Sequence, residues 1–212
     1  MSKYIKNWYY IAVYVAGIFA LIVAIGDWNL REKTLLAGLI FIFLHFYEEF
    51  GYPGGFPWIG MKIELNIKDN NPKNWPLNQV SSMFGNVWFA VFVYLLPLFL
   101  PDVRFLTLAA VIFAFPEVLG HGIIFNIKLK TWYNPGLFSS IFGLLPVSIV
   151  YLSSALHLYT WIDLVLALIW IVLNYWVAFL SPIFKRLGAM SDKYAFTEEE
   201  VNRAEKYMKK HN

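Results

Sequence analysis

Residues 8–26 read Trp-Tyr-Tyr-Ile-Ala-Val-Tyr-Val-Ala-Gly-Ile-Phe-Ala-Leu-Ile-Val-Ala-Ile-Gly and hold no charged side chain. An α-helix needs about 20 mostly apolar residues to cross the hydrocarbon core of a membrane, and this run nearly meets that length. Lys3 and Lys6 precede it as they would in a signal peptide, but Asp27 and Trp28 follow it without a small-residue cleavage site. We therefore expect an uncleaved membrane span here.

Five more apolar runs of similar length follow, at residues 32–50, 82–100, 104–126, 136–158 and 161–182. Hydrophobic residues make up 59% of the 212 residues and charged residues 15%, whereas a soluble chain has about 45–50% and about 25%. A chain of this size cannot hide so much apolar surface in a core of its own. The sequence predicts an all-α membrane bundle of six transmembrane helices over residues 1–184. A tail at 185–212 follows, with a short, solvated amphipathic helix that begins at the capping pattern of Thr197 and Glu200.

Lys and Arg predict the orientation, because cytoplasmic segments are enriched in them. If the N-terminus is cytoplasmic, 14 Lys and Arg lie on the inside, seven of them in the tail. Only Arg31, Lys33 and Arg104 then lie on the outside. We expect an integral membrane protein of the plasma membrane with both termini in the cytoplasm.

Charge and cysteine content narrow the class of function. The net charge of +3 is small, and the basic residues stand between apolar runs and form no stripe, so we expect no nucleic-acid partner. The chain has no Cys, which excludes a disulfide framework, a thiolate zinc site and a thiol nucleophile. Any bound metal must therefore use imidazole nitrogen and carboxylate or amide oxygen.

The connection between the second and third spans begins with an apolar run rich in Gly and Pro, Gly51-Tyr52-Pro53-Gly54-Gly55-Phe56-Pro57-Trp58-Ile59-Gly60. Irregular backbone survives at membrane depth only where protein or water covers it. We expect this irregular loop, residues 51–60, to fold over the cytoplasmic end of the bundle; an ordinary exposed loop is the alternative. Alternation of apolar and polar residues over 61–68 predicts a short surface strand. Asn134 followed by Pro135 predicts an N-cap that opens the fifth helix.

Ionisable side chains inside the apolar runs are the candidates for chemistry, because charge at membrane depth is costly and usually functional. His45, Glu48 and Glu49 stand at i, i+3 and i+4, so one helix face presents all three. Glu117 and His121 stand at i and i+4 and also share a face. Glu48 and Glu49 fall in a last helical turn, where the helix dipole disfavours negative charge, so helix stability does not account for them.

Depth in the membrane brings the two groups together. In the predicted orientation the second and fourth spans both run inward, and Glu49 and Glu117 precede the next Lys by 13 and 11 residues. Asn86 enters the membrane from the same side, near the start of the third span. The sequence therefore predicts that two His, three Glu and one Asn converge in the cytoplasmic half of the bilayer.

The string His45-Phe46-Tyr47-Glu48-Glu49 resembles the defining motif of the HXXEE family of integral membrane proteins. Pro53-Gly54-Gly55-Phe56 and Tyr133-Asn134-Pro135-Gly136 also resemble that family's pattern, as do a lone intramembrane Asn, here Asn86, and a downstream His, here His121. The resemblance covers roughly residues 35–150. It implies a functional site at these residues and names no reaction.

Two His and three Glu without a thiolate match the ligands of catalytic zinc and of non-haem iron or manganese. The predicted ligands of this divalent metal are His45, Glu49, Glu117 and His121. The predicted catalytic groups are Glu48, Glu49 and Asn86. One metal ion is favoured, and a carboxylate-bridged pair is the alternative. The predicted function is a metal-dependent enzyme, a hydrolase or a non-haem metal oxidoreductase, that acts on a lipid or isoprenoid-type substrate.

Three alternatives stay open. Paired Glu with His can activate water without a metal, as in intramembrane glutamate proteases, although this chain lacks their EExxxR string. The same carboxylates can serve as a relay in a proton- or cation-coupled transporter. Each ionisable or amide group can also be purely structural. We expect this of His157, Asp163 and Asn174, as a helix-end His, an outer helix cap and an interhelical hydrogen bond.

Overall fold

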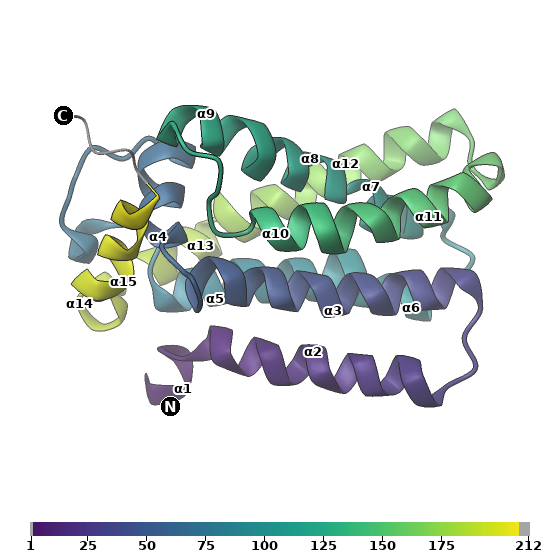
Figure 1. Cartoon of the computed structure of the whole chain (residues 1–212), viewed down its shortest axis with the longest axis horizontal. Coiled ribbons are helices and arrows are strands. Elements are labelled where there is room, and N and C mark those ends of the chain that lie inside the picture. Colours follow the sequence, from purple (N-terminus) through teal and green to yellow (C-terminus); the bar gives the residue numbers. More distant parts are fainter. Residues whose placement is uncertain (1, 208–212) are drawn as a thin grey trace.

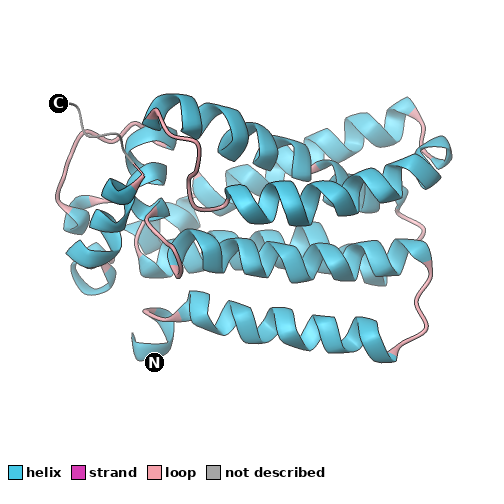
Figure 2. Cartoon of the chain, viewed as in Figure 1, coloured by secondary structure: helices cyan, strands magenta, loops and turns pink. Residues whose placement is uncertain are grey.

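The structure is a computed structural model that describes residues 2–207, except for the side chains of the first two of these. All regular structure in this range is helical (Figure 2), which confirms the all-α prediction. The long helices lie side by side in one bundle (Figure 1). Aromatic and aliphatic side chains from most of these helices form one main core cluster, centred on residues such as Leu39, Val93 and Phe113.

Five helical stretches are long and apolar enough to span a membrane. They are Trp8–Ile25, Gln79–Phe99, Arg104–Leu129, Leu137–Leu158 and Trp161–Gly188. The 21-residue helix α3, Leu30–Phe50, lies beside α2 in the bundle (Figure 1), but charged residues in its first and last turns keep it out of this set. The structure thus supports a membrane helix bundle, and the six-span topology stays a prediction.

The chain alternates α-helices with short π-helical and 3-10 turns. The first half contains α1 (Ser2–Ile5), α2 (Trp8–Ile25), α3 (Leu30–Phe50), α4 (Phe56–Ile59), η1 (Gly60–Glu64), η2 (Pro72–Asn74), α5 (Gln79–Phe89), η3 (Ala90–Leu95) and α6 (Leu96–Phe99). The second half contains α7 (Arg104–Ile112), α8 (Ala114–Val118), η4 (Leu119–Phe125), α9 (Asn126–Leu129), α10 (Leu137–Ser139), η5 (Ser140–Leu144), α11 (Leu145–Ala155), η6 (Leu156–Leu158) and α12 (Trp161–Phe179). The tail contains α13 (Pro182–Gly188), α14 (Ser191–Tyr194), α15 (Glu198–Asn202) and η7 (Arg203–Lys206).

Three of the membrane-length helical stretches combine a Pro with a π-helical turn. Pro97, Pro116 and Pro146 stand within a few residues of η3, η4 and η5. Because Pro cannot donate to the carbonyl four residues earlier, the backbone hydrogen bonds around it are rearranged, and a π turn is one way to do so. Two of these turns, η4 and η5, carry residues of the site described below.

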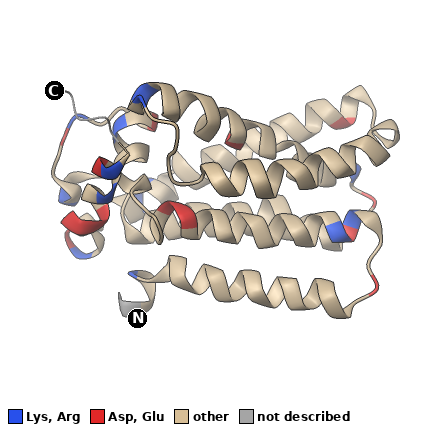
Figure 3. Ribbon diagram, viewed as in Figure 1, with Lys and Arg blue, Asp and Glu red and all other residues tan. Residues whose placement is uncertain are grey.

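Charge is distributed unevenly along the bundle. Helix α1 and the tail helices α14 and α15 lie at one end (Figure 1). Lys and Arg gather at this end, and few lie at the other (Figure 3). This is the distribution expected if that end faces the cytoplasm; the orientation itself stays a prediction.

Two local predictions are wrong. Residues 61–68 contain no strand: Gly60–Glu64 form the π-helical turn η1, and the residues after it are irregular. Ile63, Leu65 and Ile67 do pack against the core, but no described segment offers a strand to pair with them. The fifth helix starts at Leu137, after Gly136, and no described side chain caps it. The Asn134 side chain bonds to His121 instead of capping this helix.

The tail is more closely packed than its sequence predicts. Thr197 and Glu200 form the expected capping box, but Glu200 is 7% exposed, so the helix is not solvated on all sides. Tyr9 Oη and Gln79 Nε2 donate to Glu200 Oε1 at 2.8 and 2.7 Å. Arg203 Nη1 donates to the backbone oxygen of the loop residue Gly51 at 2.8 Å. An amphipathic pattern does not reveal what its apolar face packs against; residues 208–212 of the predicted tail lie outside the described residues.

Two of the residues predicted to be structural take the expected roles. Asp163 caps α12 through reciprocal hydrogen bonds with Thr160. Trp88 Nε1 donates to Asn174 Oδ1 at 2.8 Å, which joins α5 to α12. His157 is exposed in the 3-10 turn η6, at the end of the helical stretch Leu137–Leu158.

Candidate metal centre

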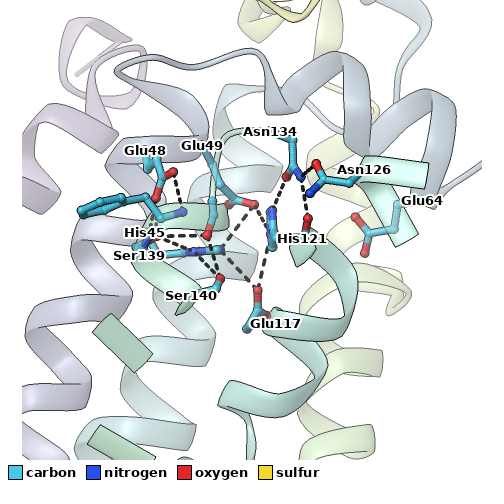
Figure 4. Close-up of polar contacts among 12 residues, drawn as sticks. His45, Glu48, Glu49, Glu64, Glu117, His121, Asn126, Asn134, Ser139 and Ser140 are labelled. Carbon is cyan, nitrogen blue, oxygen red and sulfur yellow. Dashed lines mark hydrogen bonds and ion pairs between the residues drawn. The ribbon is translucent and has the colours of Figure 1, made fainter. Parts of the chain in front are cut away.

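Four side chains meet between α3 and the helical stretch Arg104–Leu129. Figure 4 shows Glu117 and His121 pointing across to His45 and Glu49. His45 Nε2 lies 3.5 Å from Glu49 Oε1 and 3.3 Å from Glu117 Oε2. His121 Nε2 lies 3.4 and 3.6 Å from the same two oxygens. Two imidazole nitrogens and two carboxylate oxygens thus alternate around one small volume.

These four separations match the spacing of metal ligands better than that of hydrogen bonds. A charge-assisted hydrogen bond between nitrogen and oxygen is about 2.7–2.9 Å long, and all four contacts are longer. Bonds of about 2.0–2.2 Å from a tetrahedral metal to nitrogen and oxygen place neighbouring ligand atoms about 3.3–3.6 Å apart. The donor atoms of His45, Glu117 and His121 also all lie within 4.8 Å of one another. His45, Glu117 and His121 are therefore spaced so that they could hold a metal ion, whereas Glu49 lies beside this group and is not one of its three members.

Asn134 holds the ring of His121 in one tautomer. Asn134 Nδ2 donates to the backbone oxygen of His121 at 2.6 Å and to Asn126 Oδ1 at 2.8 Å, which fixes the orientation of the Asn134 amide. Asn134 Oδ1 then lies 2.7 Å from His121 Nδ1, so Nδ1 carries a proton and donates it. In the neutral ring, Nε2 keeps a lone pair, and that lone pair faces the two carboxylates.

Ser139 and Ser140 hold His45 in the same tautomer. Ser139 Oγ donates to Glu48 Oε2 at 2.5 Å, and Ser140 Oγ donates to the backbone oxygen of Gly136 at 2.7 Å. Each hydroxyl has one proton, so both can only accept from His45 Nδ1, which lies 3.0 Å from Ser139 Oγ and 3.5 Å from Ser140 Oγ. Nδ1 of His45 is therefore protonated, and Nε2 of the neutral ring is bare.

The centre gathers acceptors that need a cation. Both carboxylates and both Nε2 lone pairs face the shared volume, and His45, Glu49 and His121 are at most 4% exposed. Burying such groups together without positive charge between them is costly. Either a proton on each imidazole or one metal ion can supply that charge.

Two residues that lie outside the helix of His121, Gly136 and Phe56, hold the His121 ring in place. Gly136 lies against the ring with a φ of +100°, and a Cβ on Gly136 would overlap the imidazole. Both the left-handed backbone and this close approach require glycine. Phe56, from the predicted loop 51–60, packs against the same ring with centroids 5.6 Å apart. Residues 51–60 thus contact the centre through Phe56, and their second half forms the helical turn α4; that this segment covers a cytoplasmic face stays a prediction.

Glu48 faces away from the centre, toward the start of α10. Its Oε1 accepts from Tyr133 Oη at 2.9 Å and from the Phe138 N–H at 3.0 Å, and its Oε2 accepts from the N–H and hydroxyl of Ser139. Free N–H groups at a helix start are favourable partners for negative charge. Burial and the Glu48 charge raise the pKa of Tyr133 above its usual range, so Tyr133 stays a donor. Glu48 therefore ties α3 to α10 and orients the Ser139 hydroxyl that holds His45.

A cavity of about 490 Å³ extends from the centre, and all four residues of the centre line it. Most of its wall is apolar, with side chains such as Ile42, Phe89, Phe113 and Ile171. Asn86, on α5, lines the cavity too. Its Nδ2 donates to the backbone oxygen of Ser82 at 2.9 Å, so Asn86 stands on the cavity wall and not among the four converging side chains.

Glu64 adds a third carboxyl group to the cavity. It comes from the π-helical turn η1, and Tyr175 Oη donates to its Oε1 at 2.7 Å. The Glu64 side chain is exposed and lines the cavity, where nearby protein atoms reduce the hydration of its carboxyl. This desolvation raises the pKa of Glu64 from 4.5 to about 7, with smaller contributions from the charges of Glu49 and Glu117. Glu64 can therefore exchange a proton near neutral pH.

The sequence predicts the four converging residues but not the residues that hold their side chains in place. Asn134, Ser139 and Ser140 are short polar residues beside a helix start, where they usually serve as caps, so spacing gives no sign of a role at the centre. Glu64 lies in the segment predicted as a surface strand, which placed it in solvent. The signal available in the sequence is the string Tyr133-Asn134-Pro135-Gly136, which resembles the family pattern and contains Asn134.

The comparisons with known proteins give one match. A family model described as "Protein of unknown function with HXXEE motif" matches residues 36–151. No curated protein and no solved structure shows significant similarity to the chain. The matched segment is more than half of the chain, and it contains the four converging residues, Glu48 and the turn around Asn134, whereas α2, α12 and the tail lie outside it. The chain therefore belongs to the HXXEE family, as its motif predicts, and the centre is built entirely from the segment that defines that family.

Proposed function

We propose that this protein is a membrane-embedded, metal-dependent enzyme that acts on a lipid or isoprenoid-type substrate. The observation that carries the proposal is the meeting of the Nε2 atoms of two histidines with two carboxylate oxygens at 3.3–3.6 Å. We also propose six spans with both termini in the cytoplasm and a location in the plasma membrane. The gathering of Lys and Arg at one end of the bundle supports that orientation (Figure 3).

One metal ion suits the ligand set better than two. The centre offers two imidazoles and two carboxylates, whereas two-metal carboxylate sites in helix bundles use four Glu and two His. Zinc, iron and manganese all accept imidazole and carboxylate ligands. Such an ion would polarise a carbonyl or phosphoryl oxygen of the substrate, or would lower the pKa of a bound water molecule. With 20% of its side chain exposed, Glu117 is the most open of the four, so it marks where a substrate reaches the centre.

Other steps of the reaction, such as proton transfer and the positioning of substrate, would depend on residues of the chain. Glu49 and Glu117 lie close enough to the centre for one to bind the metal while the other accepts a proton. Glu64 lies on the same cavity and can exchange protons near neutral pH. Asn86 can orient water or substrate from the cavity wall. We assign Glu48 to positioning and not to proton transfer, because four donors already satisfy its carboxylate.

Metal analysis of the detergent-purified protein tests this proposal. We expect about one zinc, iron or manganese per chain in the wild type and a loss of that metal in Glu117→Ala. His157→Ala is the matched control, because His157 is exposed and far along the chain from the centre. Wild-type protein should also turn over members of an ester, phosphoester or isoprenoid lipid panel in liposomes, and Glu117→Ala should not. Metal-free wild-type protein with no such turnover would contradict the proposal.

A transporter is the second candidate, and the cavity gives it specific support. Three carboxyl groups, those of Glu49, Glu64 and Glu117, line one continuous space, as a proton or cation relay requires. A relay does not require bare imidazole nitrogens at ligand spacing, which is why we rank it second. Uptake of a solute driven by a pH gradient into liposomes, by protein that contains no metal, would favour the transporter.

A further inference from the structure

The cavity beside the centre has a wall that follows one face of a single membrane-length helix. Along Arg104–Leu129, the residues Pro116, Gly120, Ile124 and Lys128 all line the cavity. They recur every four residues, so they form a stripe along that helix, roughly 18 Å long at 1.5 Å per residue. Glu117, His121 and Phe125 form the next stripe and also line the cavity. The first stripe is thus the outer edge of the cavity, and the second faces inward.

Residues on this outer edge are exposed as well as cavity-lining. Ile124 is 40% exposed, and Val172, which lines the same cavity from α12, is 67% exposed. Pro116 and Lys128 are exposed too. A residue that both lines a cavity and faces outward borders an opening. The cavity therefore opens along a slot between the stripe that begins at Pro116 and the face of α12 that carries Val172.

In the proposed membrane arrangement, hydrocarbon surrounds this slot. Pro116, Ile124 and Val172 lie inside helical stretches that are long and apolar enough to span a membrane. At that depth the molecules next to an exposed apolar edge are the acyl chains of lipids. Behind the slot, the rings of Phe89 and Phe113 line the cavity and are at most 7% exposed. An apolar chain can thus pass from the bilayer into the cavity without crossing water.

We propose that the cavity takes in a hydrocarbon chain of a bilayer lipid sideways through this slot, between Ile124 and Val172. Identifying that guest as the substrate rests on the proposed function; the route itself does not. The polar part of the guest then lies among Glu117, Glu64 and Lys128, which line the same cavity, and the apolar part lies against Phe89 and Phe113. The volume of about 490 Å³ is in the usual range for a ligand site of about 300–1,000 Å³.

Photolabelling in liposomes tests the route. The probe is a phospholipid with a diazirine in one acyl chain, and adducts are mapped by mass spectrometry. In wild-type protein we expect adducts on Phe89 and Phe113, which a lipid chain reaches through the cavity, in addition to adducts on outward-facing residues. The double variant Ile124→Trp, Val172→Trp fills the slot and should reduce the interior adducts at least about tenfold, because the two indole rings occupy the opening.

The matched control uses the neighbouring residues on the same two helices. Ile123 and Ile169 are 51% and 58% exposed and do not line the cavity, so Ile123→Trp, Ile169→Trp should leave the interior adducts unchanged. Adducts on outward-facing residues report that each variant is folded in the membrane. Wild-type protein labelled only on outward-facing residues would overturn the inference, as would interior labelling that the filled slot does not reduce. Interior labelling by a water-soluble diazirine alone would overturn it too, because the cavity would then be aqueous.

This experiment separates the route from the enzyme. Labelling requires neither metal nor turnover. Interior adducts in a protein that holds no metal would support the slot and contradict the proposed function. A protein that holds metal but gives no interior adducts would do the reverse.

Discussion

Glu48 and Glu49 are adjacent carboxylates in the last turn of α3, and the structure treats them in opposite ways. Glu48 accepts four hydrogen bonds at 2.5–3.0 Å from Tyr133, Phe138 and Ser139. Glu49 Oε1 faces the Nε2 atoms of two histidines at 3.4–3.5 Å. Both side chains are less than 10% exposed, so burial does not distinguish them. The two carboxylates differ in whether neighbouring groups donate hydrogen bonds to them.

The difference shows how a buried charge reveals its role. Protein donors fully satisfy Glu48, so its charge is accounted for within the fold. The two histidines beside Glu49 donate their Nδ1–H to Ser139 and to Asn134, so the Glu49 charge is balanced either by a second proton on each ring or by a cation from outside. The first arrangement stabilises a helix junction, and the second prepares a binding site for a cation. The variants below test whether this contrast holds.

The largest expected effect is that of Gly136→Ala. The new Cβ would overlap the His121 ring at a backbone position with positive φ, so the ring must move and the centre should lose its metal, with more than about a 100-fold loss of affinity. Gly122→Ala is the control, because its Cβ would meet atoms no closer than 3.8 Å. Competition with a zinc chelator measures both. Equal affinities in the two variants would show that the position of His121 does not matter for binding.

Glu48→Gln should destabilise the fold. An amide in place of one carboxylate oxygen turns an NH₂ group toward N–H and O–H donors, and the remaining hydrogen bonds lose their ionic character. We expect the free energy of unfolding in detergent to fall by about 2–4 kcal/mol. Chemical denaturation followed by circular dichroism provides the measurement. An unchanged free energy of unfolding would mean that Glu48 does not anchor α10.

Asn134→Ala should weaken metal binding without removing a ligand. His121 Nδ1 would lose the acceptor that fixes its tautomer, and partners of this kind contribute about 10–100-fold to metal affinity. Asn126→Ala is the matched control, since Asn126 contacts the Asn134 amide but not the His121 ring nitrogens. Affinity reduced to the same extent in both variants would contradict the tautomer argument.

Glu64→Gln gives the smallest effect, and its sign depends on pH. Desolvation raises the pKa of Glu64 from 4.5 to about 7, so between these values the folded protein keeps a proton that the unfolded chain has released. This carboxyl therefore lowers the stability of the wild type as pH rises from 4.5 to about 7, and the variant lacks that loss. Tyr175, Glu49, Glu117 and His121 are the titratable groups that act on it.

Thermal unfolding at both ends of this pH range is the test for Glu64. The stability of Glu64→Gln relative to wild type should increase with pH. Glu198→Gln, at an exposed position in the first turn of α15, should show no such trend. A difference between wild type and Glu64→Gln that does not depend on pH would show that the Glu64 carboxyl titrates alike in the folded and unfolded chain.

The sequence predicts the four converging residues because their information is local. Helical spacing puts His45 beside Glu49 and Glu117 beside His121, and the length of the apolar runs sets their depth. The same spacing cannot separate Glu48 from Glu49, which differ by about 100° around the helix. Their roles depend on which neighbour each faces, the start of α10 or the stretch Arg104–Leu129, and that is a property of packing.

Other parts of the structure depend on contacts that no local pattern encodes. The sequence predicts that Asn134 is an N-cap, because nothing local shows that its side chain contacts His121. The sequence places Glu64 in a strand because apolar residues alternate there. The same alternation also occurs in an irregular segment that packs on a core, which is what the structure contains. The tail reads as solvated because its partners, Tyr9 and Gln79, are more than 100 residues away in the chain.

The most direct test of the central claim is a metal titration of two isosteric variants, Glu48→Gln and Glu49→Gln, beside wild type. We expect wild type and Glu48→Gln, measured in conditions where it stays folded, to bind about one zinc ion per chain, with Glu48→Gln weaker by less than about 100-fold. Glu49→Gln should bind none at the same free zinc concentration. Equal binding by both variants, or no binding by wild type, would contradict the claim that Glu49 and not Glu48 belongs to a metal centre.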